Sequence, residues 1–315
     1  MSATVKGTRR PSSKGDRSAR HQAAWAAAAR RRQEAERRRR RILAGAAIAL
    51  VAAVLGTLVV VRLSTGAKTA DPGPAAGPVS DELIRAITGV PAAVLDGIGA
   101  GSVDTVPRPV AGQPALTAGG KPLVLYVGAE FCPFCAAQRW GVVVALSRFG
   151  TFAGLGASRS ASDDAYPNTA TVTFHGASYT SDYLTFEGVE TQTNVRQGGG
   201  YGPLDSLTAQ QLQTVRTYNA PPYVDASSAG AIPFVDFGNR YVMVGASFKP
   251  QLLAGLSAVQ IATALADPSS PVAKAVDGSA NMFTAAICEL TGGQPAAVCT
   301  SPAVVAGRGR LHAAA

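Results

Sequence analysis

The feature that most restricts the fold is a short segment in which an apolar run leads into two closely spaced cysteines. Leu123–Val127 is rich in branched and aromatic residues and has the length of a buried strand. Gly128 and Ala129 interrupt the run, Cys132 and Cys135 follow, and Ala136 to Leu146 then has the composition of a helix. The segment predicts a strand, a tight turn, and a helix whose first turn carries both thiols.

A thiol pair at the start of a helix has a recognisable chemistry. The helix N-terminus carries a partial positive charge and unpaired N–H groups, and both favour a thiolate over a thiol. Pro133 suits the first turn, where its missing N–H costs nothing. The Cys-x-x-Cys spacing allows a small disulfide to close and to reopen by exchange. We therefore interpret Cys132 as an exposed nucleophile and Cys135 as the thiol that resolves the mixed disulfide.

Two other interpretations of the motif remain open, namely half of a zinc site and a redox-inactive relic. The other cysteines, Cys288 and Cys299, lie far downstream. Two of the three histidines, His21 and His312, fall in expected tails, so a four-ligand zinc cage is poorly supplied. The third, His175, is expected to be structural, with proton transfer near the dithiol as the alternative. The sequence predicts no metal site and no cofactor.

A second informative segment runs from Ala231 to Ala246. Two apolar runs flank Gly238-Asn239, which predicts a β-hairpin. The Ile232-Pro233 pair before this hairpin and the strand before FCPFC together resemble the thioredoxin superfamily. The resemblance implies an α/β thioredoxin-like fold in which Pro233 is cis and lies against the dithiol; an ordinary trans proline at a strand start is the alternative. It also implies four substrate-binding residues, which are Pro133, Phe134, Ile232 and Pro233.

The chain departs from thioredoxins in two places. Six residues before the first cysteine, thioredoxins carry a buried carboxylate that helps to move protons, whereas this chain has Tyr126. Glu130 is therefore a candidate for proton transfer, with water as the alternative. Phe134 replaces the histidine of strongly oxidising members, which implies a milder reduction potential. The resemblance covers roughly residues 121–265 and is interrupted by an insertion at about 151–230.

The positive charge of the chain is confined to its N-terminus. Residues 1–41 contain fourteen Lys and Arg and three acidic residues, while the net charge of the whole chain is +9. The next twenty residues, 42–61, carry no charge and no proline, and at ~1.5 Å per residue they match the ~30 Å core of a bilayer. We expect a single transmembrane helix, with the basic tail in the cytoplasm on anionic lipids and the remainder outside the cell membrane.

The N-terminal segment has two alternative interpretations, a cleaved signal peptide and a nucleic-acid-binding tail. A cleaved signal peptide usually has an apolar core of only about 7–15 residues. The arginine-rich blocks could bind nucleic acid through counterion release, but their position directly before the apolar run favours the membrane. We expect no nucleic-acid partner.

The remaining sequence divides by composition. Residues 62–80 are rich in proline and glycine and predict a linker, 81–300 a folded extracytoplasmic domain, and 301–315 a disordered tail. Within the domain, helices are expected at 80–86, 91–95, 204–218, 251–265 and 271–290, and further strands at 170–175 and 183–191.

Cys288 falls in the last turn of an expected helix, and Cys299 follows shortly afterwards. Outside the cytoplasm, such a pair predicts a structural disulfide, with a second redox pair as the alternative. The anchor, the GAEFCPFC segment and this cysteine pair are together similar to the family catalogued as domain of unknown function 929. The expected activity is thiol–disulfide exchange with cysteines of exported proteins and with an unidentified redox partner. A redox-inert binding or scaffold module of the cell envelope is the alternative.

Overall fold

The computed structural model describes residues 77–313. The basic tail, the apolar run at 42–61 and most of the expected linker therefore lie outside the described residues. Within 77–313, no helix combines the length and the apolar character that a membrane crossing requires. The end of the expected linker is already folded, because Gly77–Pro78 form strand β1 and Ser80 caps the first described helix.

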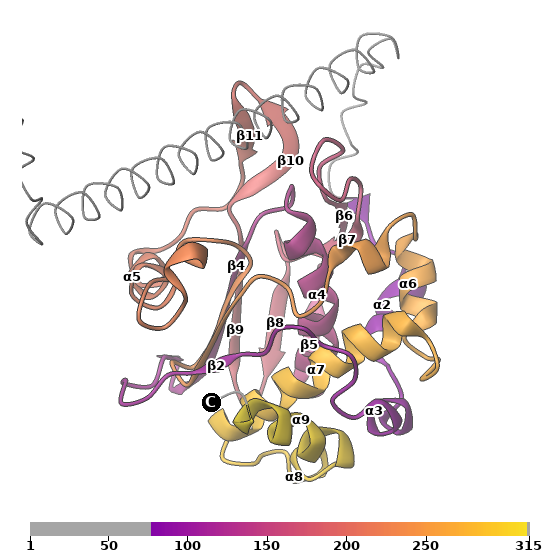
Figure 1. Cartoon of the computed structure of the whole chain (residues 1–315), viewed down its shortest axis with the longest axis vertical. Helices are drawn as coiled ribbons and strands as arrows, with labels where there is room; N and C mark the ends of the chain where they lie inside the picture. The colour runs from indigo at the N-terminus through magenta and orange to yellow at the C-terminus, as the bar shows by residue number, and fades with distance from the viewer. Residues whose placement is uncertain (1–76, 314–315) are drawn as a thin grey trace, which may run out of the picture. The chain divides into compact units, whose positions relative to one another are not determined.

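The described chain has a mixed α/β fold built on a six-stranded sheet (Figure 1). Its strands run in the order β2-β13-β12-β4-β3, with β9 also paired to β4. The β4–β9 pair is parallel and the β4–β12 pair is antiparallel; since both cover the same part of β4, they occupy its two edges. The strands are β2 (Arg108–Pro109), β3 (Thr117–Ala118), β4 (Lys121–Gly128), β9 (Thr185–Glu190), β12 (Phe234–Phe237) and β13 (Tyr241–Val244).

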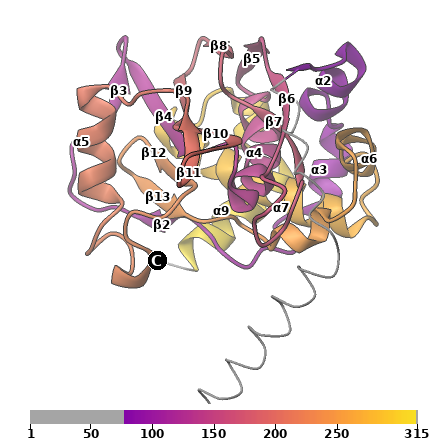
Figure 2. The same cartoon turned by 90° about the horizontal axis from the view of Figure 1, so that it is seen from above.

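Side chains of β4 alternate between two hydrophobic cores, as expected for a strand covered on both faces. Val124 and Tyr126 join the larger core with α4 (Pro133–Leu146) and α7 (Pro271–Leu290). Leu123, Leu125 and Val127 join the smaller core, which includes α5 (Ala209–Tyr218). Figure 2 shows α5 on one side of the sheet and α4 and α7 on the other. This arrangement buries β4 from Leu123 to its end and fixes the start of α4 at one end of the sheet.

The expected insertion at 151–230 is not one continuous addition. It contains β9, which belongs to the central sheet because its six residues pair with β4. The additions therefore fall on either side of this strand, and the 192–203 hairpin extends beyond the end of the sheet (Figure 1). They comprise β5 (Gly150–Ala153), β6 (Gly156–Arg159), β7 (Ala170–Thr173) and β8 (Ser178–Ser181) before β9, and β10 (Gln192–Gln197), β11 (Gly200–Pro203) and α5 after it.

The larger core is covered on the side away from the sheet by helices α2 (Asp81–Thr88), α3 (Ala92–Ile98) and α6 (Ala258–Ala264). The expected helix at 251–265 is divided into a short 3₁₀ turn, Pro250–Leu253, and α6, which begins after a capping box at Ser257. Helix α5 likewise starts later than expected, where Thr208 supplies a capping box. Helix α7 has the expected bounds.

The prediction of a disordered tail at 301–315 is wrong. Residues Pro302–His312 form α9, which packs on α7 and buries Val304 and Leu311. The approach is close because Gly307 has no side chain: a Cβ there would lie 2.6 Å from the carbonyl oxygen of Asn281. Small residues give a weak sequence signal, but they allow two helices to pack closely.

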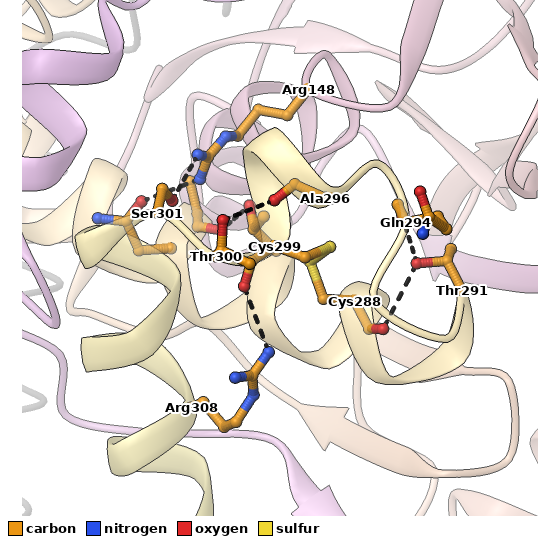
Figure 3. The surroundings of a disulfide bond; sticks show 12 residues. Arg148, Cys288, Thr291, Gln294, Ala296, Cys299, Thr300, Ser301 and Arg308 are labelled. Carbon is orange, nitrogen blue, oxygen red and sulfur yellow. Dashed lines mark hydrogen bonds between the residues drawn. A yellow bond between two sulfur atoms is a disulfide. The ribbon is translucent and has the colours of Figure 1, made fainter.

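The predicted bond between Cys288 and Cys299 is present and joins the end of α7 to α8 (Ala296–Cys299), as Figure 3 shows. Both cysteines are buried in the larger core. Two arginines bracket the bridge: Arg308 of α9 donates to the carbonyl oxygen of Cys299 at 3.5 Å, and Arg148 donates to Ser301 at 3.2 Å. The bridge therefore fixes the segment from which α9 departs.

Candidate active site

The two thiols lie at the start of α4, as the sequence predicted. Cys132 is the N-cap residue with extended backbone angles, and Pro133 is the first helical residue. The backbone N–H of Cys135 donates to the sulfur of Cys132, with 3.4 Å between the nitrogen and Sγ. The cap position thus places the first sulfur where the unpaired N–H groups of the helix point.

The surroundings make the two thiols unequal. Cys132 is 6% exposed and Cys135 is completely buried. A hydrogen bond from Cys135 is the largest cause that lowers the pKa of Cys132; backbone N–H groups of the helix start and the guanidinium of Arg139 add to it. Burial raises the pKa of Cys135 well above its usual range. One thiol is therefore suited to ionise and the other to stay protonated.

The expectation of an exposed nucleophile needs correction, because only a small part of Cys132 reaches the surface. The segment before β12 covers it: the sulfur lies 3.9 Å from the carbonyl oxygen of Ile232. The Ile232–Pro233 bond is cis, as the resemblance implied. Pro233 is held in turn by the N–H of Gly245, which donates to its carbonyl oxygen at 2.8 Å. The predicted hairpin over β12 and β13 therefore brings the Ile-Pro segment to the dithiol.

Aromatic side chains lie next to Cys132 and extend to the neighbouring loops. Phe134, between the two cysteines, is 38% exposed, and its ring lies edge-on to Tyr166 at 5.9 Å. Phe131 stacks on Tyr201 of β11 with 4.3 Å between the ring centroids. Arg196 lies over the same tyrosine at 4.2 Å and forms an ion pair with Asp163, in the loop between β6 and β7. The additions on either side of β9 therefore form the rim of the site.

The candidates for proton transfer differ in position. Glu130 is buried beside the dithiol loop, and its Oε1 has no hydrogen-bond partner within the described range. The hydroxyl of Tyr126 lies 3.5 Å from the carbonyl oxygen of Cys135, and burial raises the pKa of Tyr126 well above its usual range. His175 is directed elsewhere, because its ring pairs with Asp205 at 2.7 Å.

The ring of Tyr126 fits only because residue 128 is glycine. A Cβ at Gly128 would lie 2.5 Å from the hydroxyl oxygen of Tyr126. The glycine that ends β4 therefore has a packing role beneath the dithiol in addition to breaking the strand.

A charged pair that was not predicted from the sequence lies beneath the dithiol. Arg139 of α4 and Glu190 of β9 form a fully buried ion pair with 2.6 Å between Nη2 and Oε2. Arg139 also donates to the carbonyl oxygen of Ala129, in the loop before the thiols. A charged residue four positions after the second cysteine of an otherwise apolar helix was the available signal. Among residues 77–313, no group of three or more metal-binding side chains is present.

Comparisons with curated proteins and with solved structures give no match. The profile of the family described as "Domain of unknown function (DUF929)" matches residues 110–289, more than half of the chain. This range contains the dithiol, the Ile232-Pro233 segment, the buried ion pair and nearly all of α7. The chain therefore belongs to the DUF929 family.

Proposed function

We propose that this protein is a thiol–disulfide oxidoreductase. The observation that carries the proposal is the unequal thiol pair at the start of α4, in which the Cys132 sulfur caps the helix and accepts from the N–H of Cys135, whereas Cys135 is completely buried. A site that exchanges disulfides needs one thiol that attacks as a thiolate and a second that waits until a mixed disulfide has formed.

In the reducing direction, the Cys132 thiolate attacks one sulfur of a substrate disulfide. The attacked sulfur forms a mixed disulfide with Cys132, the substrate S–S bond breaks, and the other substrate sulfur leaves as a thiolate that takes up a proton. Cys135 then loses its proton and attacks Cys132, which releases the second substrate thiolate and leaves a Cys132–Cys135 disulfide. The protein is oxidised by two electrons and the substrate disulfide is reduced; the same steps in reverse oxidise a substrate dithiol.

The substrate segment is proposed to lie over the narrow opening at Cys132. The Ile232 carbonyl lies against the Cys132 sulfur, Pro133 and Pro233 follow these two residues in the chain, and Phe134 supplies exposed apolar surface beside them. An extended segment with an apolar side chain beside its cysteine would fit these groups. Glu130, buried near the thiols, is the proposed group for proton transfer to and from Cys135.

The finer fold assignment is also a proposal. The parallel β4–α4–β9 unit, the antiparallel β12–β13 hairpin on the other edge of β4, and the following α7 support a thioredoxin-like fold. Its additions are the segments on either side of β9 and helices α8 and α9.

We further propose that residues 42–61 anchor the chain in the cell membrane with its thiol domain outside the cytoplasm. The arginine block before the apolar run supports this orientation, and the Cys288–Cys299 disulfide supports an oxidising compartment. The substrates would then be cysteines of exported proteins. Retention of the chain in membranes after washing at high pH tests the anchor, and release would contradict it.

Exchange itself is tested with the full-length chain and a peptide disulfide in glutathione buffers. We expect the wild type and Cys288→Ser/Cys299→Ser to catalyse exchange and Cys132→Ser to be inactive. Cys135→Ser should accumulate a mixed disulfide on Cys132, because the resolving thiol is missing. A wild-type dithiol that stays unchanged across all buffers would refute the activity.

A redox-inert binding module is the second candidate. The small exposure of Cys132 favours it, because a protein thiol would need local movement to reach the sulfur. This candidate predicts that the thiols react with a small alkylating reagent but form no mixed disulfide with the peptide in the Cys135→Ser variant.

A further inference from the structure

The ion pair between Arg139 and Glu190 is isolated from water. Both side chains are completely buried, and Nε and Nη2 of the guanidinium donate to the two carboxylate oxygens at 2.7 and 2.6 Å. Burying two charges costs several kcal/mol per ion before their attraction is counted, and apolar residues of similar volume often give equal or greater stability. Stability alone therefore does not account for the pair.

The position of Arg139 relates it to the thiols. It follows Cys135 by four residues and Cys132 by seven, so the three residues lie along one face of α4. Long helical side chains lean toward the N-terminus of their helix, which directs the guanidinium toward the sulfurs. Its Nη2 donates to the carbonyl oxygen of Ala129, three residues before Cys132, at 2.8 Å, and within residues 77–313 its Nη1 has no partner.

Glu190 comes from a different part of the fold. It is the last residue of β9 and pairs in register with Gly128, the last residue of β4. The parallel pairing therefore brings a carboxylate to the end of the sheet at which α4 begins. The backbone N–H of Glu190 donates to the side chain of Asp205 at 3.1 Å, which fixes this strand end. The backbone that carries the carboxylate is thus fixed in part by a contact outside the dithiol loop.

Arg139 and Glu190 both influence the pKa values of the dithiol. After the hydrogen bond from Cys135 and the helix N–H groups, the guanidinium contributes to the lowered pKa of Cys132. Burial is the largest cause of the raised pKa of Cys135; the Cys132 sulfur and the Glu190 carboxylate raise it further, and Arg139 opposes them. Two more ionisable groups lie near the pair, namely the Tyr126 hydroxyl and the Glu130 carboxyl.

We propose that Arg139 and Glu190 are a positioning pair for the dithiol. The guanidinium stabilises the Cys132 thiolate, while the carboxylate holds the guanidinium in place and favours the protonated form of Cys135. The proposal deepens the exchange reaction proposed above and rests on it for its biological meaning. Its physical content, a charge that acts on a thiolate, is measurable whether or not exchange occurs.

The test follows alkylation of Cys132 by iodoacetamide in the full-length chain from pH 4 to 10, with the modified peptide counted by mass spectrometry. Arg139→Met/Glu190→Leu removes both charges and keeps the volume of the pair. We expect its alkylation midpoint to rise by at least about one pH unit, a roughly tenfold loss of thiolate below the midpoint. Arg139→Lys keeps the positive charge, so its alkylation midpoint should stay close to that of the wild type. The exposed pair Arg108–Asp225 supplies the control Arg108→Gln/Asp225→Asn, whose midpoint should match that of the wild type.

A folded double variant whose midpoint equals that of the wild type would overturn the proposal. If this variant does not fold, the same criterion applies to Arg139→Gln/Glu190→Gln, whose amides can hydrogen-bond to each other. Failure of the proposed function is recognised separately, because the Cys132 thiolate reacts with iodoacetamide even if it attacks no protein disulfide. A shifted midpoint with no exchange in glutathione buffers would retain the positioning pair and reject the oxidoreductase.

Discussion

A buried carboxyl group in α7 predicts how the stability of the protein depends on pH. Asp277 is completely buried, and within the described residues neither of its carboxylate oxygens has a hydrogen-bond partner. Burial alone raises its pKa to about 8. In the unfolded chain the same group has a pKa of about 3.9. Between these values the native state binds a proton that the unfolded state has lost.

The sign follows from proton linkage. Because the unfolded state binds fewer protons between about pH 4 and pH 8, the free energy of unfolding falls as the pH rises through this interval. Each pKa unit corresponds to about 1.4 kcal/mol, so Asp277 lowers stability by roughly 4 kcal/mol at pH 7 relative to pH 4. This is a large share of the ~5–15 kcal/mol that is typical of a folded domain.

Asp277→Asn replaces the protonated carboxyl with a neutral group of similar size. We expect the variant and the wild type to have similar unfolding free energies near pH 4.5, and the variant to be more stable by about 3 kcal/mol at pH 7. Denaturant unfolding of the full-length chain, followed by the fluorescence of the buried Trp140, measures both. Asp236, whose pKa burial raises to about 7, affects both proteins alike and cancels in the difference.

The matched control is Asp182→Asn at an exposed position, which should follow the wild type at every pH. A constant difference between Asp277→Asn and the wild type from pH 4.5 to 8 would refute the reasoning. It would mean that the carboxyl is not held neutral by burial.

Three further predictions concern packing and the disulfide. Cys288→Ser/Cys299→Ser should lower the free energy of unfolding by about 3 kcal/mol, because a loop of about twelve residues is no longer constrained in the unfolded chain; the alkylation profile of the dithiol should not change. A chain that ends at Ser301 lacks α9, exposes the apolar face of α7 and should lose at least about 3 kcal/mol, whereas an unchanged denaturation curve would contradict the packing of α9. Gly128→Ala should cost about 1–3 kcal/mol through its collision with Tyr126, and Tyr126→Phe should recover part of this loss if the collision is its cause.

Local patterns predicted the parts of the site that are close in sequence. The strand before Cys132, the helix after it and the hairpin at Gly238-Asn239 all follow from short-range rules on apolar runs and turns. The approach of Ile232 to the thiols came from a family resemblance, because a contact across a hundred residues leaves no local signal.

The features that sequence reasoning missed depend on tertiary packing. Arg139 and Glu190 are 51 residues apart, and only the parallel pairing of β4 with β9 brings them together. The sequence predicts the strand at β9 but places it in the insertion, because the residues of a strand do not show which other strand it pairs with. Helix α9 was read as a tail because its small residues lack an apolar stripe, although Gly307 is what permits its close contact with α7.

The packing of α4 against α7 sets an order of events during synthesis. Cys132 and Cys135 leave the ribosome roughly 150 residues before the end of the helix that buries their own helix. At ~5–20 residues per second, this interval lasts on the order of 10–30 s. Until Glu190 and Ile232 have also emerged, neither the buried ion pair nor the Ile232 carbonyl can act on the two thiols. The dithiol therefore leaves the ribosome before the groups that surround it and before Cys288 and Cys299, so its final environment depends on the arrival of the C-terminal half.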